Sequence, residues 1–334
     1  MSILVAPDSF KGTYTAAEVA AAIAAGIHDA GGSATQLPVA DGGEGTFEAL
    51  CRSLRASPVS VDVVNSWGEP LQANLGLAPD GTAVVEVAQA SGLSAVRPTP
   101  QDAMSASTYG TGLLIAAAVN LGAKSILVAA GGSATTDGGT GAVRAIAENG
   151  GLGEARITVL SDVTTSFLDA AQVFGPQKGA DPATVLLLEE RLGRLASSLP
   201  RNPSGVPRTG AAGGLSGGLW AHFGAELVSG AEAVLDAANF DSLLGTAEAV
   251  VVGEGRLDSQ TGKGKIISAI LERVGQSGRV IPVVAVVGSV HKDLGSYAQN
   301  FADVIVATEV EGMRAAGRAL ASAFSCSGQP RPQP

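Results

Sequence analysis

The sequence predicts an α/β protein in which both chain ends form a Rossmann-like parallel-sheet domain, with an inserted second α/β domain containing mixed or antiparallel sheet. Short, continuous Val/Ile runs bounded by glycine recur near both ends of the chain. Such runs are typical of strands buried on both faces of a parallel sheet. Between them the pattern alternates between apolar and polar residues, as in antiparallel sheet.

Chain length supports the division into domains, because 334 residues exceed the size at which a single hydrophobic core keeps growing. We therefore expect a Rossmann-like domain at residues 1–58 and 236–324 and an inserted domain at 59–235. The last stretch, 325–334, is rich in Ser, Gly, Pro and Gln. We expect it to be a flexible tail, because it buries too little apolar surface to offset its ordering entropy.

The opening of the chain predicts a β-α-β-α unit. Residues 3–6 form an apolar run, and apolar residues from 16 to 27 recur at helical spacing behind Thr15 and Glu18, which form a capping-box pattern. Residues 36–40 predict the next strand, and residues 46–54 predict the helix that follows it.

The middle and end of the chain supply the remaining elements. Alternating runs near residues 61–64 and 83–87 are separated by turn signals. The other expected elements are helices at 111–121 and 183–198 and strands at 126–130, 157–160, 249–252, 280–287 and 304–307.

Composition excludes several classes of function. A formal net charge of −10 opposes binding to nucleic acid and to acidic membranes, because such binding depends on Lys and Arg. Cys51 and Cys326 form neither a disulfide framework nor a metal-binding spacing. The N-terminus has no leader pattern, and no apolar run reaches the length of a membrane span. We expect a cytoplasmic protein that acts on a small molecule, and the sequence does not fix its oligomeric state.

Five predicted strand ends each carry an aspartate. These are Asp8, Asp41, Asp137, Asp162 and Asp258. Any one of them taken alone reads best as a cap of the following helix. Their joint occurrence favours a shared cleft, because ligands of parallel sheets bind where the strands end.

No complete nucleotide-binding motif is present. The glycine-rich loops lack a Walker A sequence, and Ile115 occupies the place of the last glycine in the fragment that begins at Gly110. The segment GGSATTDGG, from Gly131 to Gly139, lies between a predicted strand and a helix. Backbone N–H groups in such a loop can hold anionic oxygens.

The loops supply what phosphoryl transfer requires: cations for a triphosphate, acids for Mg²⁺, and a carboxylate that accepts a hydroxyl proton. The candidate cations are Lys11, Lys178, Arg256 and Lys265. The alternative for the lysines is solvated surface charge, and for Arg256 it is a structural ion pair with Glu254 and Asp258. The three histidines are too scattered for a triad or a zinc site.

Six ordered motifs resemble the bacterial glycerate kinase family of the glycerate 2-kinase type. They are PDSFKGTYTA at Pro7, VADGGEGT at Val39, GGSATTDGG at Gly131, VFGPQKGA at Val173, GAAGGLSGGL at Gly210 and GEGRLDSQTGKGK at Gly253. The resemblance implies an enzyme that phosphorylates D-glycerate with ATP and Mg²⁺, at the 2-hydroxyl, in a cleft between two α/β domains.

Two stretches depart from the family pattern. Between Glu148 and Ile157 the chain has only a short glycine-rich connection, where relatives carry a sizeable segment. After Asp162, Val163 and Thr164 relatives usually continue with Asn-Pro-Leu, whereas this chain has Thr165, Ser166 and Phe167. The glycine-containing turn that follows in relatives is replaced here by residues 168–170. These departures suggest a trimmed cleft wall and altered substrate contacts.

The residues and the resemblance together give the following expected roles. Catalysis is assigned to Asp258, Asp41, Lys11 and Arg256, with Asp258 or Asp41 as the proton acceptor. ATP binding is assigned to Gly131, Gly132, Ser133, Thr135, Asp137, Gly138, Lys178, Gly213 and Gly214. Substrate binding is assigned to Asp8, Ser9, Glu44, Glu254, Ser259, Gln260 and Lys265, and Mg²⁺ binding to Asp8 and Asp162.

Two alternatives stay open. The altered stretch after Thr164 suggests a kinase for another small hydroxy acid. The missing segment before Ile157 suggests a catalytically inactive protein that senses a metabolite, although retention of every acidic loop argues against this reading.

Overall fold

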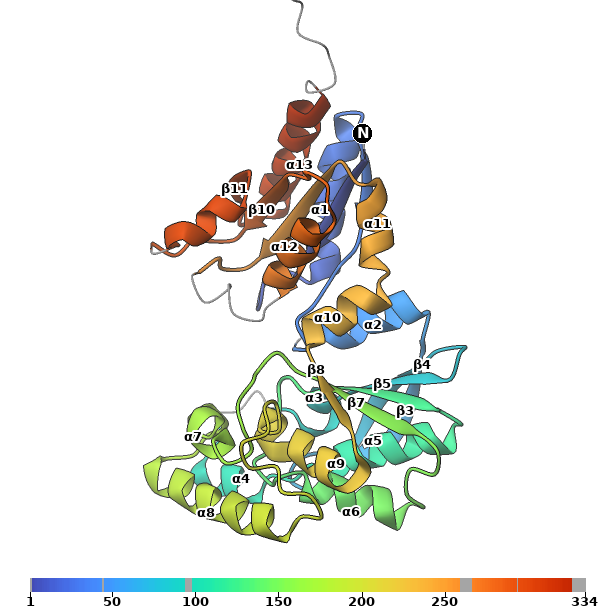
Figure 1. Ribbon diagram of the computed structural model, residues 1–334, viewed down its shortest axis with the longest axis vertical. Coiled ribbons are helices and arrows are strands. Elements are labelled where there is room, and N and C mark those ends of the chain that lie inside the picture. The colour runs from blue at the N-terminus through green and yellow to red at the C-terminus, as the bar shows by residue number, and fades with distance from the viewer. Residues whose placement is uncertain (1, 44, 94–97, 259–265, 293, 326–334) are drawn as a thin grey trace, which may run out of the picture. The chain divides into compact units, whose positions relative to one another are not determined.

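The computed structural model describes residues 2–43, 45–93, 98–258, 266–292 and 294–325. The chain forms two compact units, one from Met1–Asp41 with Val234–Pro334 and the other from Gly42–Ala233 (Figure 1). The predicted α/β class, with a parallel sheet built from both chain ends and an inserted α/β unit, is confirmed. The predicted limits at 58/59 and 235/236 stay a prediction about which segments fold independently.

The first unit is built on a parallel sheet with the strand order β11-β10-β9-β1-β2. Its strands are β1 (Ser2–Pro7), β2 (Ser33–Gln36), β9 (Ala249–Glu254), β10 (Val283–Val287) and β11 (Asp303–Val306). Ile3 pairs with Ala249 on one side and with Ala34 on the other, so the first strand of the chain lies at the centre of the sheet.

Helices cover both faces of this sheet (Figure 1). They are α1 (Ala16–Asp29), α11 (Phe240–Thr246), α12 (Ile266–Gln276) and α13 (Val310–Ser325), and a 3₁₀ turn, η3, spans Gly295–Asn300. On one face, Ile23 of α1 and Met313 of α13 pack against Val5 and Val251 of the central strands. Alternate residues of a strand point to opposite faces, so Leu4 and Val250, which are also buried, point to the other face of the sheet.

The predicted start of α1 is confirmed in detail. The Glu18 carboxylate accepts the Thr15 N–H at 2.8 Å, and the Thr15 hydroxyl accepts the Glu18 N–H at 3.2 Å. This reciprocal pair satisfies backbone donors that the first turn of a helix leaves unpaired.

The predicted strand at residues 36–40 is wrong in position. β2 covers Ser33–Gln36, and although Leu37 and Val39 still donate their N–H groups to β1 carbonyls, the strand has ended. Pro38 lies between them and carries no N–H group, which prevents a regular ladder. The apolar stretch therefore crosses the sheet edge as a connection that delivers Asp41.

The second unit contains a mixed sheet with the strand order β3-β4-β5-β6-β7-β8. Its strands are β3 (Ser57–Val64), β4 (Pro70–Leu77), β5 (Thr82–Glu86), β6 (Ser125–Ala129), β7 (Arg156–Leu160) and β8 (Glu226–Val228). β3, β4 and β5 pair antiparallel, whereas β5 through β8 pair parallel. The parallel half is the part that presents its strand ends to the glycine-rich loops.

The helices of the second unit cluster around that sheet. They are α2 (Thr46–Leu54), α3 (Val87–Ser91), α4 (Pro100–Ser105), α5 (Tyr109–Asn120), α6 (Thr140–Glu148), α7 (Ala170–Phe174), α8 (Pro182–Ser198) and α9 (Leu215–Phe223). The short 3₁₀ turns η1 and η2 span Pro176–Lys178 and Ala211–Gly214, and α10 (Gly230–Ala237) leads the chain back into the first unit. One core joins the sheet to α5, α6 and α9, and a smaller core forms around Phe167 between α4, α7 and α8.

No helix in the described ranges has both the length and the apolar character needed to cross a lipid bilayer.

Candidate functional site

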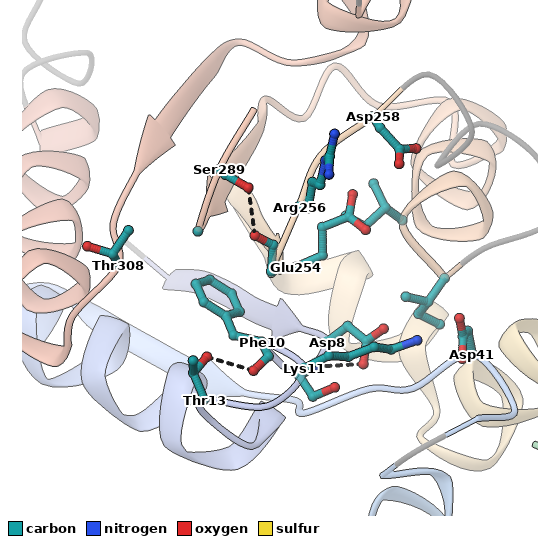
Figure 2. Close-up of a pocket in the computed structure, with 15 residues that line it drawn as sticks. Asp8, Phe10, Lys11, Thr13, Asp41, Glu254, Arg256, Asp258, Ser289 and Thr308 are labelled. Atoms are coloured by element: carbon teal, nitrogen blue, oxygen red, sulfur yellow. Dashed lines mark hydrogen bonds between the residues drawn. The ribbon is translucent and has the colours of Figure 1, made fainter. Parts of the chain in front are cut away.

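A charged pocket of about 460 Å³ opens in the first unit where the parallel strands end (Figure 2). Its walls come from the segments that follow β1, β2, β9, β10 and β11. The lining residues are Asp8, Ser9, Phe10, Lys11, Thr13, Asp41, Glu254, Gly255, Arg256, Asp258, Ile266, Ile267, Gly288, Ser289 and Thr308. Four carboxylates and two cations therefore share one cavity.

Strand order explains why the pocket lies here. After β1 the chain crosses to β2 on one side of the sheet, and after β9 it crosses to β10 on the other side. Connections that leave two neighbouring strands in opposite directions open a crevice between them, which is where open α/β sheets bind ligands. Asp8 follows β1 and Arg256 follows β9, so both lie at this switch point.

Asp8 is a strongly perturbed acid of the pocket. Its side chain is only 7% exposed, and one carboxylate oxygen accepts the Ser9 N–H at 2.6 Å. Burial, followed by the charge of Asp41, raises the pKa of Asp8 to about 7, while the Ser9 N–H and the Lys11 ammonium oppose the rise. A carboxyl that titrates near neutrality is able both to bind a cation and to exchange a proton.

Figure 2 shows the Lys11 ammonium directed toward the part of the pocket that holds Asp8 and Asp41. Arg256 and Asp258 line the pocket from the segment after β9. Among the described lining residues the acids outnumber the cations, and Lys11 and Arg256 are the side chains that attract an anionic substrate.

Backbone pairing fixes the segment that carries Arg256 and Asp258. Leu257 donates its N–H to the Ser289 carbonyl at 2.9 Å, and His291 donates to the Leu257 carbonyl at 2.8 Å. The Ser289 hydroxyl also donates to the Gly255 carbonyl at 3.3 Å (Figure 2). The loops after β9 and β10 thus run side by side up to Asp258.

The structure adds lining residues that the sequence analysis missed. Phe10 and Thr13 follow β1, whereas Ser289 and Thr308 follow β10 and β11. Ser289 and Thr308 come directly after predicted strands, but a search for charged turns overlooks uncharged ones. The place of a residue after a parallel strand is the signal that finds them.

Four residues assigned to substrate binding, Glu44, Ser259, Gln260 and Lys265, lie outside the described residues. Seven residues with expected roles lie together in this pocket. They are Asp8, Ser9, Lys11, Asp41, Glu254, Arg256 and Asp258.

In the second unit, the Asp137 carboxylate binds the starts of two helices. One oxygen accepts the Thr108 N–H at 2.8 Å, the Thr108 hydroxyl at 2.9 Å and the Gly141 N–H at 3.1 Å, and the other accepts the Gly139 N–H at 3.0 Å. Thr108 precedes α5, and Gly139 precedes α6. Asp137 thus occupies the place that an anionic ligand takes at a helix N-terminus.

Lys178 lies beneath the same loop. It is 3% exposed, and its ammonium donates to the Ser133 hydroxyl at 3.0 Å and to the Thr135 carbonyl at 2.7 Å. Burial lowers the pKa of Lys178 to about 7, and the charge of Asp137 opposes this shift. The ammonium therefore supports the loop from inside.

The two glycine-rich loops pack backbone against backbone. Gly138 donates its N–H to the Gly213 carbonyl at 3.1 Å. Gly213 has a φ of +64°, and a side chain there would overlap the Thr135 carbonyl. Only glycine combines this left-handed backbone with so close an approach.

Asp162 lies at a third position, at the end of β7. Its carboxylate accepts the Ser229 hydroxyl at 2.7 Å and the Ala231 N–H at 3.2 Å, at the beginning of α10. Its assignment as a metal ligand stays a prediction.

The two departures from the family pattern have structural correlates. Phe167 is fully buried in the core between α7 and α8, and it packs against the Gly214 and Gly217 backbone. This part of the altered stretch is a core element and not a surface one. The short connection between α6 and β7 consists of turns with positive φ at Gly150, Gly151 and Gly153.

Comparison with known proteins gives one consistent result. The model of the glycerate kinase family matches residues 3–150 and 147–323. A glycerate kinase of Halalkalibacterium halodurans is 38% identical over 326 residues, covering 86% of this chain and 85% of that protein. The glycerate 2-kinase of Escherichia coli K12 is 35% identical over 343 residues, covering 91% and 90%.

Structural similarity agrees with the sequence matches. A crystal structure from Salmonella typhimurium LT2, provisionally named glycerate kinase 2, superposes with a TM-score of 0.85 at 33% identity. The superposition covers 99% of this chain and 100% of the other.

Proposed function

Because the chain belongs to the glycerate kinase family, we propose that it transfers the γ-phosphoryl group of ATP to the 2-hydroxyl of D-glycerate, giving 2-phosphoglycerate and ADP. The observation that carries this proposal is the pocket at the ends of β1 and β9, which gathers acids and cations at the switch point of the sheet. Relatives named glycerate kinase and glycerate 2-kinase support the choice of substrate.

In the proposed reaction, a carboxylate accepts the proton of the substrate hydroxyl as its oxygen attacks the γ-phosphorus and ADP departs. Asp258 and Asp41 are the proposed proton acceptors, because both line the pocket. Asp8 is a third candidate, since its pKa of about 7 is matched to proton exchange near neutral pH.

Lys11 and Arg256 are the proposed partners of the substrate carboxylate and the transferred phosphoryl group, because they supply the positive charge of the pocket. Ser9 and Glu254 line the same pocket and keep their proposed roles in substrate binding. The proposed substrate-binding roles of Glu44, Ser259, Gln260 and Lys265 rest on the sequence alone.

The acids of the pocket suit an Mg²⁺ ion that also binds phosphate oxygens and water. Within the described residues, no three His, Cys, Asp or Glu side chains are grouped to form a cage of protein ligands. Kinase sites instead hold Mg²⁺ with one or two carboxylates together with phosphate oxygens and water. Asp8 offers such a carboxylate beside Asp41. Bound there, the ion would offset the negative charge of the phosphates.

The loops of the second unit are the proposed contacts to ATP. Ser133 and Thr135 lie on one glycine-rich loop, and Gly213 and Gly214 lie on the other. The remaining residues proposed for the ATP site are Gly131, Gly132, Asp137, Gly138 and Lys178, of which Lys178 lies buried behind the loop. The N–H donors of such loops suit phosphate oxygens.

A coupled assay of ADP release with D-glycerate, Mg²⁺ and ATP, followed by identification of the product, tests the proposal. Release of ADP with formation of 2-phosphoglycerate supports it. Release only with a different acid from a panel of short hydroxy acids favours a variant substrate specificity, and tight glycerate binding without ADP release favours a sensor. We further propose a cytoplasmic location, supported by the free Cys51 and by the use of ATP.

A further inference from the structure

Lys178 is an unusual residue to find inside a domain. It is 3% exposed, and in the part of the chain that the structure describes no carboxylate lies within ion-pair distance of its ammonium. An unpaired buried ammonium is costly, and an apolar side chain of similar length would fill the space without that cost. The position of this lysine therefore calls for a local explanation.

The contacts of the Lys178 ammonium supply this explanation. The ammonium donates to the Ser133 hydroxyl at 3.0 Å and to the Thr135 carbonyl at 2.7 Å, and it lies 5.9 Å from the centre of the Phe174 ring. Both hydrogen-bond acceptors belong to the loop between β6 and α6. The ammonium thus ties two places of one loop together, and it is covered by that loop.

This arrangement leaves the donors of Ser133 unused. Its hydroxyl oxygen accepts from Lys178, so its own hydrogen is available to another acceptor. Among the described residues, neither the hydroxyl hydrogen nor the N–H groups of Gly132 and Ser133 have an acceptor. Gly132 is exposed and has a φ of +69°, so the loop meets solvent next to Ser133, whose own side chain is buried.

We propose that Lys178 is a positioning residue that orients Ser133, so that the Ser133 hydroxyl and the neighbouring N–H groups bind an anionic phosphate oxygen. The ligand chemistry is that of a phosphate monoester or anhydride, carried by the nucleotide or by the phosphorylated acid. The inference rests on the proposed function and assigns the contact to Ser133, with Lys178 acting behind it.

The helix N-terminus beside this loop does not compete for the same ligand. Asp137 already accepts the N–H groups of Gly139 and Gly141 there. The free donors are at Gly132 and Ser133, at the other end of the loop. An anion attracted to the loop therefore meets Ser133 and not α6.

The test compares wild type, Lys178→Met, Ser133→Ala and the double variant, with the exposed Lys124→Met as the matched control. Dissociation constants for ADP and for 2-phosphoglycerate, the KM for ATP and the KM for D-glycerate are measured for each variant. Each single change is expected to weaken binding of one phosphorylated ligand by about tenfold, the loss expected for one hydrogen bond to a charged group. The KM for D-glycerate is expected to stay within about twofold of the wild-type value. An effect confined to one ligand distinguishes a positioning role from a general loosening of the fold.

The double variant carries the decisive result. Because Lys178 acts through Ser133, the two losses should not add. The double variant should lose no more affinity than the single variant with the larger loss, which is a strong departure from additivity. Weaker ADP binding assigns the oxygen to the nucleotide, and weaker 2-phosphoglycerate binding assigns it to the phosphorylated acid. Either result supports the proposal.

Three outcomes overturn it. Unchanged binding of both ligands in Ser133→Ala is sufficient to reject the proposal, even where the Lys178 variants do not fold. An effect of Lys178→Met that Ser133→Ala does not share would mean that the lysine itself contacts the ligand, and multiplicative losses in the double variant would mean that the two residues act separately. Wild type that binds ADP but releases none with D-glycerate contradicts the proposed function alone, and leaves the binding comparison intact.

Discussion

The Asp41 carboxylate is the largest charge effect on the Asp8 carboxyl, and together with burial, the larger cause, it raises the pKa of Asp8 to about 7. Both side chains line one pocket, at the ends of β1 and of the connection after β2. The pocket therefore contains an acid whose protonation changes in the range where the enzyme is expected to work.

Replacing Asp8 by Asn is expected to stabilise the protein at neutral pH. The folded-state pKa of Asp8 exceeds the ordinary value of 3.8, so the folded protein holds a proton that the unfolded chain releases. This contribution to stability is complete below about pH 4 and disappears as the pH rises through about 7. The variant should therefore gain on the order of 4 kcal/mol over wild type across that window, if the whole shift is expressed.

Urea unfolding at several pH values, without divalent cations, measures this difference. Asp303→Asn is the matched control, because Asp303 is exposed on β11 and should keep the wild-type pH dependence. A constant gap between Asp8→Asn and wild type from pH 4 to pH 8 would contradict the assignment.

Asp258→Asn is expected to lower kcat by about 10²–10⁴ while the KM for D-glycerate changes little, because a general base acts on the transition state. Steady-state kinetics with wild type and Asp303→Asn alongside give the comparison. Unchanged turnover rejects this role for Asp258 and transfers the test to Asp41→Asn and then Asp8→Asn.

Lys11→Met is expected to shift the acidic limb of the kcat/KM profile to higher pH. The positive charge of Lys11 lowers the pKa of Asp8, so its removal lets that pKa rise further. Lys11→Arg retains the charge and should keep the limb near its wild-type position. An acidic limb that does not move in Lys11→Met would show that Asp8 does not govern the profile.

Asp137→Asn is expected to destabilise the second unit by about 2–3 kcal/mol, because an amide nitrogen would then face N–H donors that now bind a carboxylate. These donors belong to Thr108, Gly139 and Gly141. Urea unfolding measures the loss, and the KM for ATP reports any separate role in nucleotide binding. A large rise in that KM with unchanged stability would favour direct contact with the nucleotide.

The sequence predicts the buried strands of the first unit well and the edge strand β2 poorly. β9 and β10 are continuous apolar runs because both of their faces are covered. β2 has the sequence SATQ and lies at the sheet edge, where polar residues are tolerated. The apolar stretch after it attracts the strand prediction, and Pro38 is the residue that argues against it.

The acids of the site are predictable for a similar reason. Acids that recur near the ends of several buried strands favour a shared site more strongly than any one of them does, and Asp8, Asp41 and Asp258 do line one pocket. The hydrogen bonds of Asp137 depend on Thr108, which is distant in sequence, so only the folded arrangement shows that this aspartate caps two helices. The contacts of Lys178 depend in the same way on tertiary structure.

The central position of β1 has a consequence for synthesis on the ribosome. β1 leaves the exit tunnel well before its neighbour β9, which follows only after the whole inserted unit has been translated. At roughly 5–20 residues per second, an emerging N-terminal segment waits many seconds for its partner. Its apolar strand stays accessible to chaperones during that interval, and the pocket needs segments as late in the chain as Thr308, after β11.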